Sequence, residues 1–165
     1  MVFFVSKNVG KLNLIWYNFF MEKKKNVTLY TDGACSGNPG RGGWGAVLLF
    51  GKFEKQMSGM KEITTNNQME LTAVIEGLKA LKEPCSVMVY SDSAYVVNAF
   101  NNNWIEGWVN NNWRNSKKEP VANRELWEEL IELTKVHEVT FNKVKGHAGD
   151  KYNEICDSLA TAFNK

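Results

Sequence analysis

Hydrophobic and polar residues alternate with the period of a β-strand in several short stretches of this chain. Residues 27–31, Val-Thr-Leu-Tyr-Thr, predict a strand over 27–32, which the Gly-rich run from Gly33 to Gly45 would end. We expect further strands at similar stretches, and helices where apolar residues recur at helical spacing. The strands are predicted over 43–50, 52–60, 85–91 and 138–144, and the helices over 64–82, 93–100, 123–135 and 150–163.

This order of elements predicts the fold class. Three consecutive strands followed by alternating helices and strands indicate an α/β domain, in which a five-stranded mixed sheet is flanked by helices. Thr64 or Thr65 would cap the first long helix, and Asn123 would cap the helix over 123–135. In such sheets ligands gather at the C-terminal ends of strands, so candidate chemistry is expected there.

Composition narrows the class of protein without deciding its function. The chain has 165 residues, 44% of them hydrophobic, which suffices for one compact domain. Its net charge of +2 means that binding of nucleic acid would depend on a local basic patch. The 3 cysteines are far apart and odd in number, so neither a disulfide framework nor a zinc site is expected. A reducing, cytoplasmic setting fits best.

Residues 1–20 differ from the rest of the chain. Polar residues, including Lys7 and Lys11, interrupt their apolar runs, which excludes a membrane span of about 20 apolar residues. The layout of a signal peptide is also missing. We interpret this segment as a non-essential extension, for example from an upstream start codon, in front of a single domain over 21–165. The alternative is an amphipathic segment that packs on the surface of that domain.

Four acidic residues are candidates for a functional site, and two of them fall in strands that are otherwise apolar. Asp32 and Asp92 fall at the ends of two predicted strands, while Glu70 and Asp157 fall on predicted helices. An unpaired buried carboxylate is costly, so a cation or a shared metal ion is expected as its partner. Neighbouring strands lie about 4.8 Å apart, which lets two carboxylates share one ion. Mg²⁺ prefers oxygen ligands, and two ions about 3.5–4 Å apart form the clamp used for phosphoryl displacement.

The sequence motifs around these acids resemble those of one protein family. The resemblance covers about residues 26–163, and its motifs follow one another in order. They are YTDGACSGNPGRGGWGAVL (30–48), TTNNQMELTAVIEGLKAL (64–81), YSDSAYVVNAF (90–100) and KGHAGDKYNEICDSLA (145–160). Together they resemble ribonuclease H, type 1, and imply its fold.

The resemblance implies endonucleolytic hydrolysis of the RNA strand of an RNA–DNA hybrid, giving 5′-phosphate and 3′-hydroxyl ends. Asp32 would bridge two Mg²⁺ ions, with Mn²⁺ as a substitute. Glu70 and Asp92 would hold the ion that activates water, with Glu70 also near the ribose 2′-OH, and Asp157 would hold the other ion. His147, between glycines in its loop, would assist proton transfer or product release.

The resemblance also implies contacts with both strands of the hybrid. Asn and Gln amides suit the minor groove because they both donate and accept hydrogen bonds. The residues implied near the minor groove are Gly33, Asn38, Asn66 and Asn67, and those implied near the DNA strand are Thr65, Trp104 and Asn123. Asn66 also has helix capping as an alternative role.

Residues 101–122 are rich in Asn and Trp and resemble the basic handle of bacterial members. Four basic residues stand against one acid between 110 and 124, and Asn110, Asn111 and Asn112 occupy places where relatives often have basic residues. This weaker handle predicts a shallower salt dependence of binding. A second departure is Ala94, where many relatives have a longer polar residue, so one substrate contact is in doubt. Trp104, Trp108 and Trp113 are expected to pack this segment against the domain more than to contact substrate.

The expected molecule is a free-standing monomer with no membrane association and no obligate protein partner. Two other functions stay open at this point. One is a module that binds RNA–DNA hybrids without cutting them, and the other is a DNA nuclease or integrase-like enzyme of the same superfamily. The complete set of acids argues against the first, and the combination of Gly-Asn-Pro-Gly, Thr-Thr-Asn-Asn and the Trp-rich segment argues against the second.

Overall fold

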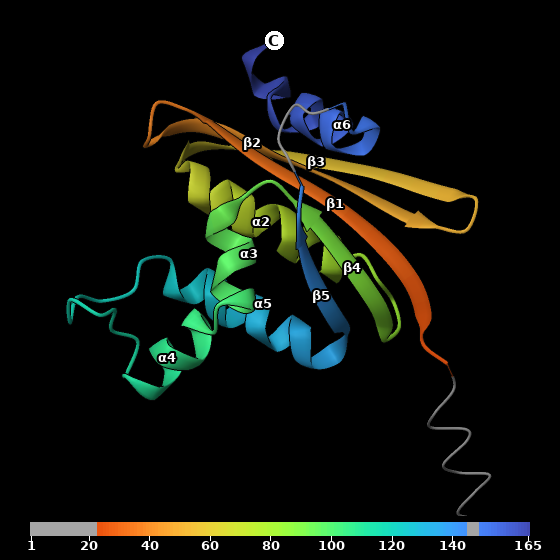
Figure 1. The fold of residues 1–165 in the computed structure, drawn as a ribbon. Coiled ribbons are helices and arrows are strands. Elements are labelled where there is room, and N and C mark those ends of the chain that lie inside the picture. The colour runs from red at the N-terminus through yellow and green to blue at the C-terminus, as the bar shows by residue number, and fades with distance from the viewer. Residues whose placement is uncertain (1–22, 145–148) are drawn as a thin grey trace, which may run out of the picture.

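The computed structural model describes residues 23–144 and 149–165, which form the predicted α/β architecture (Figure 1). The strands are β1 (Lys25–Ser36), β2 (Gly40–Phe50), β3 (Phe53–Thr64), β4 (Cys85–Ser91) and β5 (Glu138–Lys143). The helices are α2 (Asn66–Lys79), α3 (Ala94–Asn101), α4 (Trp104–Asn110), α5 (Arg124–Val136), α6 (Lys151–Ala160) and the 3-10 helix η1 (Ala162–Asn164). Within the described ranges, every helix is too short or too polar to cross a membrane.

One mixed sheet of five strands organises the domain, as predicted. Its strand order is β3-β2-β1-β4-β5. The first three strands pair antiparallel, whereas β4 pairs in parallel with β1, and β5 in parallel with β4. The strand β1 is therefore central, with the hairpin of β2 and β3 on one side and the two parallel strands on the other.

Helices cover both faces of the sheet, with α2, α3 and α5 on one face and α6 on the other (Figure 1). The close approach of α6 depends on two glycines of β2. A Cβ at Gly43 would lie 2.4 Å from the carbonyl oxygen of Ala160, and one at Gly45 would lie 2.5 Å from that of Cys156. Cβ atoms do not approach backbone that closely, so only glycine allows α6 to rest directly on β2.

The apolar core lies between the sheet and the helices of the α2 face. Leu29 of β1, Leu71 of α2 and Trp127 of α5 are fully buried there. The Trp127 ring lies 5.1 Å from the Tyr95 ring and 5.2 Å from the Trp108 ring, measured between centroids. This one side chain therefore joins α3, α4 and α5 in a single aromatic cluster, which positions the segment between α3 and α5.

His137 belongs to no motif in the sequence and has a structural role. It is 4% exposed, and its Nδ1 accepts a hydrogen bond from the Cys85 N–H at 3.2 Å. Burial lowers the pKa of its imidazole. The ring is thus held in its neutral form, where it links the end of α5 to the start of β4.

Several predicted boundaries were wrong. The strand β1 continues through Asp32 to Ser36, and β2 begins at Gly40, because the glycines predicted to end the strand instead pair across the sheet, Asp32 lying opposite Gly45. The helix predicted over 64–82 spans only Asn66–Lys79, and the one predicted over 150–163 ends at Ala160 before η1.

The segment 101–122 contains α4, an element that the sequence did not predict. Its N-cap residue, Asn103, has a φ of 57° and makes no capping hydrogen bond through its side chain, so the usual start signal is absent. The helix forms because Trp108 packs against Trp127, which lies in a different part of the sequence.

We expect Gly45→Ala to destabilise the protein by about 1–3 kcal/mol, since the new methyl group would force α6 away from β2. Gly107→Ala is the matched control, because a Cβ there would have no neighbour within 4 Å and Gly107 lies inside α4. That substitution should be neutral or stabilising by up to about 1 kcal/mol. Urea unfolding followed by circular dichroism measures both, and equal effects would contradict the packing argument.

Candidate active site

Strand pairing places two of the predicted acids side by side. Thr31 of β1 pairs with Ser91 of β4 in the parallel ladder, so the residues that follow them, Asp32 and Asp92, lie next to each other. Asp32 is only 6% exposed. The two strands are neighbours, which is the condition for Asp32 and Asp92 to share one ion.

Glu70 reaches the same place from α2, because α2 lies unusually close to β1. A Cβ at Gly33 would lie 2.3 Å from the Glu70 backbone nitrogen, so the absence of a side chain at Gly33 is what allows this contact. Glu70 is 5% exposed as a result. Gly33 thus has a packing role, and its predicted contact with a ribose stays a prediction.

Asp32, Glu70 and Asp92 form one cluster, in which a carboxylate oxygen of each lies within 4.8 Å of the others. Burial, followed by the charge of Asp92, raises the pKa of Asp32 to about 7. Burial, followed by the charge of Asp32, raises the pKa of Glu70 well above its ordinary value. The Gly33 N–H donates to Asp32 Oδ1 at 2.9 Å, which opposes the shift without cancelling it. Among the residues that the structure describes, no positive charge compensates the two raised carboxylates.

Asp157 approaches this cluster from the opposite face of the sheet. It lies on α6, whose N-cap Asp150 accepts hydrogen bonds from the N–H groups of Tyr152 and Asn153 at 3.0 and 3.2 Å. The charge of Asp157 contributes to the raised pKa of Asp32, so the two carboxylates face each other closely enough to interact. The structure thus brings Asp157 to the site as a fourth, more peripheral acid.

The cluster has the properties of a divalent metal site. Within residues 23–144 and 149–165, none of the ion pairs involves Asp32, Glu70 or Asp92. The buried Oε2 of Glu70 also has no hydrogen-bond partner among these residues. A divalent cation would satisfy this oxygen and neutralise the repulsion, and the all-oxygen donor set suits a hard ion.

Two residues predicted near the minor groove meet beside the acids. The backbone N–H of Asn66 donates to Asn38 Oδ1 at 3.1 Å, which ties the β1–β2 turn to the start of α2. Asn66 and Asn67 are both exposed. The capping role considered for Asn66 belongs instead to Thr65, whose Oγ1 accepts from the Gln68 N–H at 3.2 Å.

A hydrogen-bonded chain connects α2 to the start of α5. Gln68 Nε2 donates to Asn123 Oδ1 at 3.2 Å, and Asn123 Nδ2 donates to the Tyr95 hydroxyl at 3.2 Å. Asn123 occupies the predicted N-cap position of α5, but its side chain makes no capping hydrogen bond because these two contacts engage it. Gln68 was missed as a site residue, since nothing in its local sequence shows that its partner lies 55 positions away.

The tryptophans of the handle-like segment divide into two groups. Trp108 and Trp113 are partly buried against the core, as predicted, whereas Trp104 is 41% exposed at the outer end of the aromatic cluster. The Arg124 guanidinium lies 5.2 Å from the centroid of the Trp113 ring. One of the few cations in this region is therefore engaged with an aromatic ring.

His147, the predicted mobile histidine, lies outside the described residues, so its role stays a prediction. The other implied positions fall in two groups around the acids. The first, at the β1–β2 turn and the start of α2, contains Asn38, Thr65, Asn66 and Asn67, and the second, towards α5 and α4, contains Asn123 and Trp104.

Comparisons with known proteins identify the family to which this chain is similar. The profile of the RNase H family matches residues 24–164. A protein of Chlorobium luteolum named Ribonuclease H is 58% identical over 137 residues, which cover 83% of this chain and 94% of that protein. LC9-RNase H1, a type 1 RNase H with the type 2 active-site motif, has a TM-score of 0.75 and 28% identity, covering 84% of this chain and 72% of its own. LC11-RNase H1, solved in complex with an RNA/DNA hybrid, shares the fold with a TM-score of 0.63 and 23% identity, covering 82% of this chain and 94% of its own.

The raised pKa of Asp32 predicts how stability depends on pH without metal. Asp32 has a pKa of 3.8 in the unfolded chain and of about 7 in the folded protein. Between these two pH values the folded protein keeps a proton that the unfolded chain has lost. The contribution of Asp32 to the free energy of unfolding is therefore lost as pH rises from 3.8 to about 7. At pH 8, Asp32→Asn should therefore be more stable than the wild type by at least about 1 kcal/mol in EDTA. Towards pH 4 the difference should nearly vanish.

Thermal melts of both proteins between pH 4 and pH 8 measure this effect. His137, whose pKa is also shifted, is present in both proteins, so its contribution cancels in the comparison. Glu106→Gln removes an exposed acid of α4 and serves as the control. Millimolar Mg²⁺ should stabilise the wild type more than Asp32→Asn. If Asp32→Asn were less stable than the wild type at pH 8 in EDTA, the Asp32 carboxylate would be stabilised by interactions within the protein and would not depend on a metal ion.

Proposed function

The chain belongs to the ribonuclease H family, and we propose that it hydrolyses the RNA strand of RNA–DNA hybrids. The observation that carries this proposal is the cluster of Asp32, Glu70 and Asp92, whose carboxylate oxygens lie within 4.8 Å of one another; the first two are buried and Asp92 is partly exposed. The cluster has no cationic side chain as a partner among the described residues. The enzyme is a metal-dependent nuclease, and Mg²⁺ is the proposed ion because the donors are all oxygens.

Asp32, Glu70, Asp92 and Asp157 would hold two Mg²⁺ ions when substrate is bound, and Mn²⁺ would substitute. Bound there, the ions would activate water and neutralise charge developing on the phosphate. Asp32 has the central place, since it interacts with each of the other acids. Asp32 would be a ligand of both ions, Glu70 and Asp92 would hold the ion that activates water, and Asp157 would hold the other ion.

Recognition of the RNA strand is proposed for the Asn38–Asn66 pair and for Asn67. The hydrogen bond between Asn38 and Asn66 fixes the turn relative to α2, and the exposed amides beside it offer both donors and acceptors. Such groups suit the ribose 2′-hydroxyl and the base edges of the shallow minor groove. The contact of the Gly33 backbone with a ribose is proposed at the same place.

Recognition of the DNA strand is proposed for Thr65, Asn123 and Trp104. The Gln68–Asn123 hydrogen bond holds the Asn123 amide relative to α2. The exposed ring of Trp104 would pack on a deoxyribose, for which its 41% exposure leaves room. His147 is proposed to assist proton transfer or product release. The enzyme is further proposed to act as a monomer in the cytoplasm.

We expect Asp32→Asn and Glu70→Gln each to reduce hybrid cleavage by about a thousandfold or more, because each removes a ligand that supports several kcal/mol of charge stabilisation. An end-labelled hybrid is incubated with Mg²⁺, beside single-stranded RNA, duplex RNA and duplex DNA. Glu76→Gln, an acid on the same helix that pairs with Lys79, should leave the rate unchanged. Tight binding of the hybrid without cleavage in Mg²⁺ or Mn²⁺ would instead identify a binding module.

We expect Gln68→Leu to weaken hybrid binding by roughly three- to tenfold, since it releases the Asn123 side chain by removing the bond between them. The substitution also removes the hydrogen bond that the Thr64 hydroxyl donates to Gln68 Oε1. Dissociation constants measured in Ca²⁺ by fluorescence anisotropy report the effect. Gln56→Leu, on β3 and bonded only to Glu54 in the structure, is the control. If Asn123→Ala and Gln68→Leu weaken binding independently, then Gln68 does not act through Asn123.

A further inference from the structure

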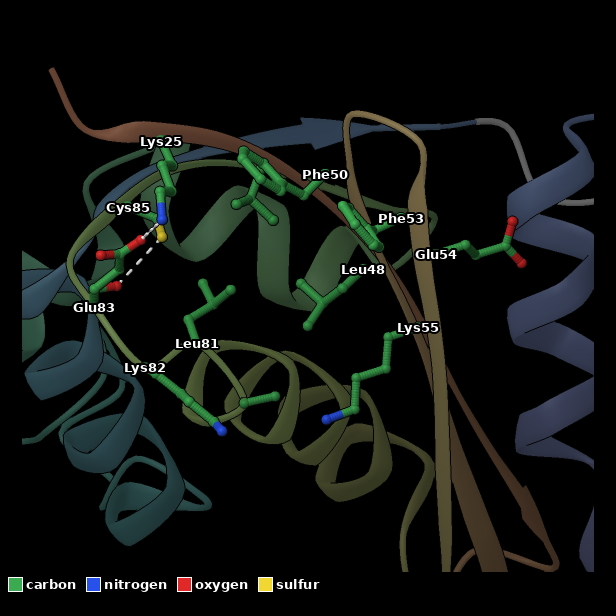
Figure 2. A pocket seen from close by; sticks show the side chains of 12 residues that line it. Lys25, Leu48, Phe50, Phe53, Glu54, Lys55, Leu81, Lys82, Glu83 and Cys85 are labelled. Carbon is green, nitrogen blue, oxygen red and sulfur yellow. Dashed lines mark hydrogen bonds and ion pairs between the residues drawn. The ribbon is translucent and has the colours of Figure 1, made fainter.

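An apolar groove lies at the opposite end of β1 from the acids (Figure 2). Its volume is about 450 Å³. The groove is formed by the start of β1, the β2–β3 hairpin and the loop between α2 and β4, and its apolar lining includes Val27, Leu48, Phe50, Phe53, Leu81 and Cys85. Lys25, which also lines it, is seven positions before Asp32, a distance of roughly 23 Å along a strand. The groove is therefore separate from the catalytic site.

Two aromatic residues at the hairpin stand on the rim of this groove. Phe50 and Phe53 pair across the β2–β3 turn, and they are 42% and 76% exposed. In Figure 2 both rings lie on the side of the groove that faces Leu81. Exposed aromatic residues that adjoin an apolar hollow mark an interaction surface more often than a plain solvated surface.

The start of β1 lies next to this groove. Thr28 pairs with Leu49, so β1 runs past the end of β2 and its start lies beside the hairpin. The Lys25 Nζ lies 5.9 Å from the centroid of the Phe50 ring. The residues before β1 therefore leave the sheet next to the groove.

The nearby part of the N-terminal segment has the composition that the groove would accept. Residues 14–20 read Leu-Ile-Trp-Tyr-Asn-Phe-Phe, with no charged side chain. They lie outside the described residues, but Phe20 is only five positions before Lys25. Five extended residues span about 16 Å, which is enough to reach Phe50.

We propose that residues 14–20 cover this groove, with their aromatic side chains against Phe50 and Phe53. A cavity of about 150 Å³ holds one benzene ring, so a groove of about 450 Å³ holds two or three aromatic side chains. A tethered segment also has a millimolar effective concentration, which favours it over a second copy of the chain or a separate partner. The segment is thus a structural part of the domain and is independent of the proposed hydrolysis.

Coupling between the segment and the groove tests the proposal in the full chain. Phe19→Asp/Phe20→Asp and Phe53→Asp should each lower Tm by about 3–6 °C, because each places a charge in the same apolar contact. The combined variant should melt no lower than the more affected of the two. Hydrogen exchange of residues 50–55 should be faster in Phe19→Asp/Phe20→Asp than in the wild type.

Ile63→Asp is the matched control, since Ile63 lies on the same strand and is 75% exposed but does not line the groove. Its effect on Tm should be small and should add to that of Phe19→Asp/Phe20→Asp. The proposal fails if Phe53→Asp behaves like Ile63→Asp, or if its effect adds to that of the segment variant. It also fails if light scattering shows a dimer that Phe53→Asp dissociates, since the occupant would then be a second chain.

Discussion

The repulsion among Asp32, Glu70 and Asp92 is the constraint on which the rest of the structure depends. The oxygens of the three carboxylates lie within 4.8 Å of one another, and the setting disfavours the charge of Asp32 and of Glu70. The parallel pairing of β1 with β4 and the contact of α2 with Gly33 leave these side chains no freedom to separate. The energy that opposes this repulsion comes from the apolar core around Trp127 on the same face of the sheet. The fold thus imposes the site, and a bound cation would complete it.

Small residues decide how the two faces of the sheet contribute to the site. Gly33 lets α2 approach from one face, and Gly43 and Gly45 let α6 approach from the other. The first contact brings Glu70 to the acids and the second brings Asp157. The Gly-rich stretch therefore serves the site through packing within the sheet, whereas its composition alone indicates a turn. The turn itself is confined to the few residues between β1 and β2.

Local pattern was enough to predict the sheet, the long helices and the positions of Asp92 and Glu70, because alternation and helical spacing are local properties. The extent of β1 could not be predicted, since its second half is a strand only through its pairing with β2. The helix α4 could not be predicted from the sequence for a similar reason, because it depends on the packing of Trp108 against Trp127. The Gln68–Asn123 hydrogen bond joins residues 55 positions apart, and its geometry exists only in the folded chain.

The energetics of the site also bear on whether the chain cuts hybrids or only binds them. A protein that only bound a hybrid would gain stability if neutral residues replaced Asp32 and Glu70, because both carboxylates are buried and resist ionisation. The residues proposed to contact nucleic acid, such as Asn38 and Asn123, do not depend on those charges, since they are held by hydrogen bonds of their own. The binding surface and the acid cluster are therefore separable parts of the molecule. Keeping an unstable acid cluster beside the residues proposed to bind nucleic acid is useful only if the cluster does chemistry, which argues for the hydrolytic function over the binding module.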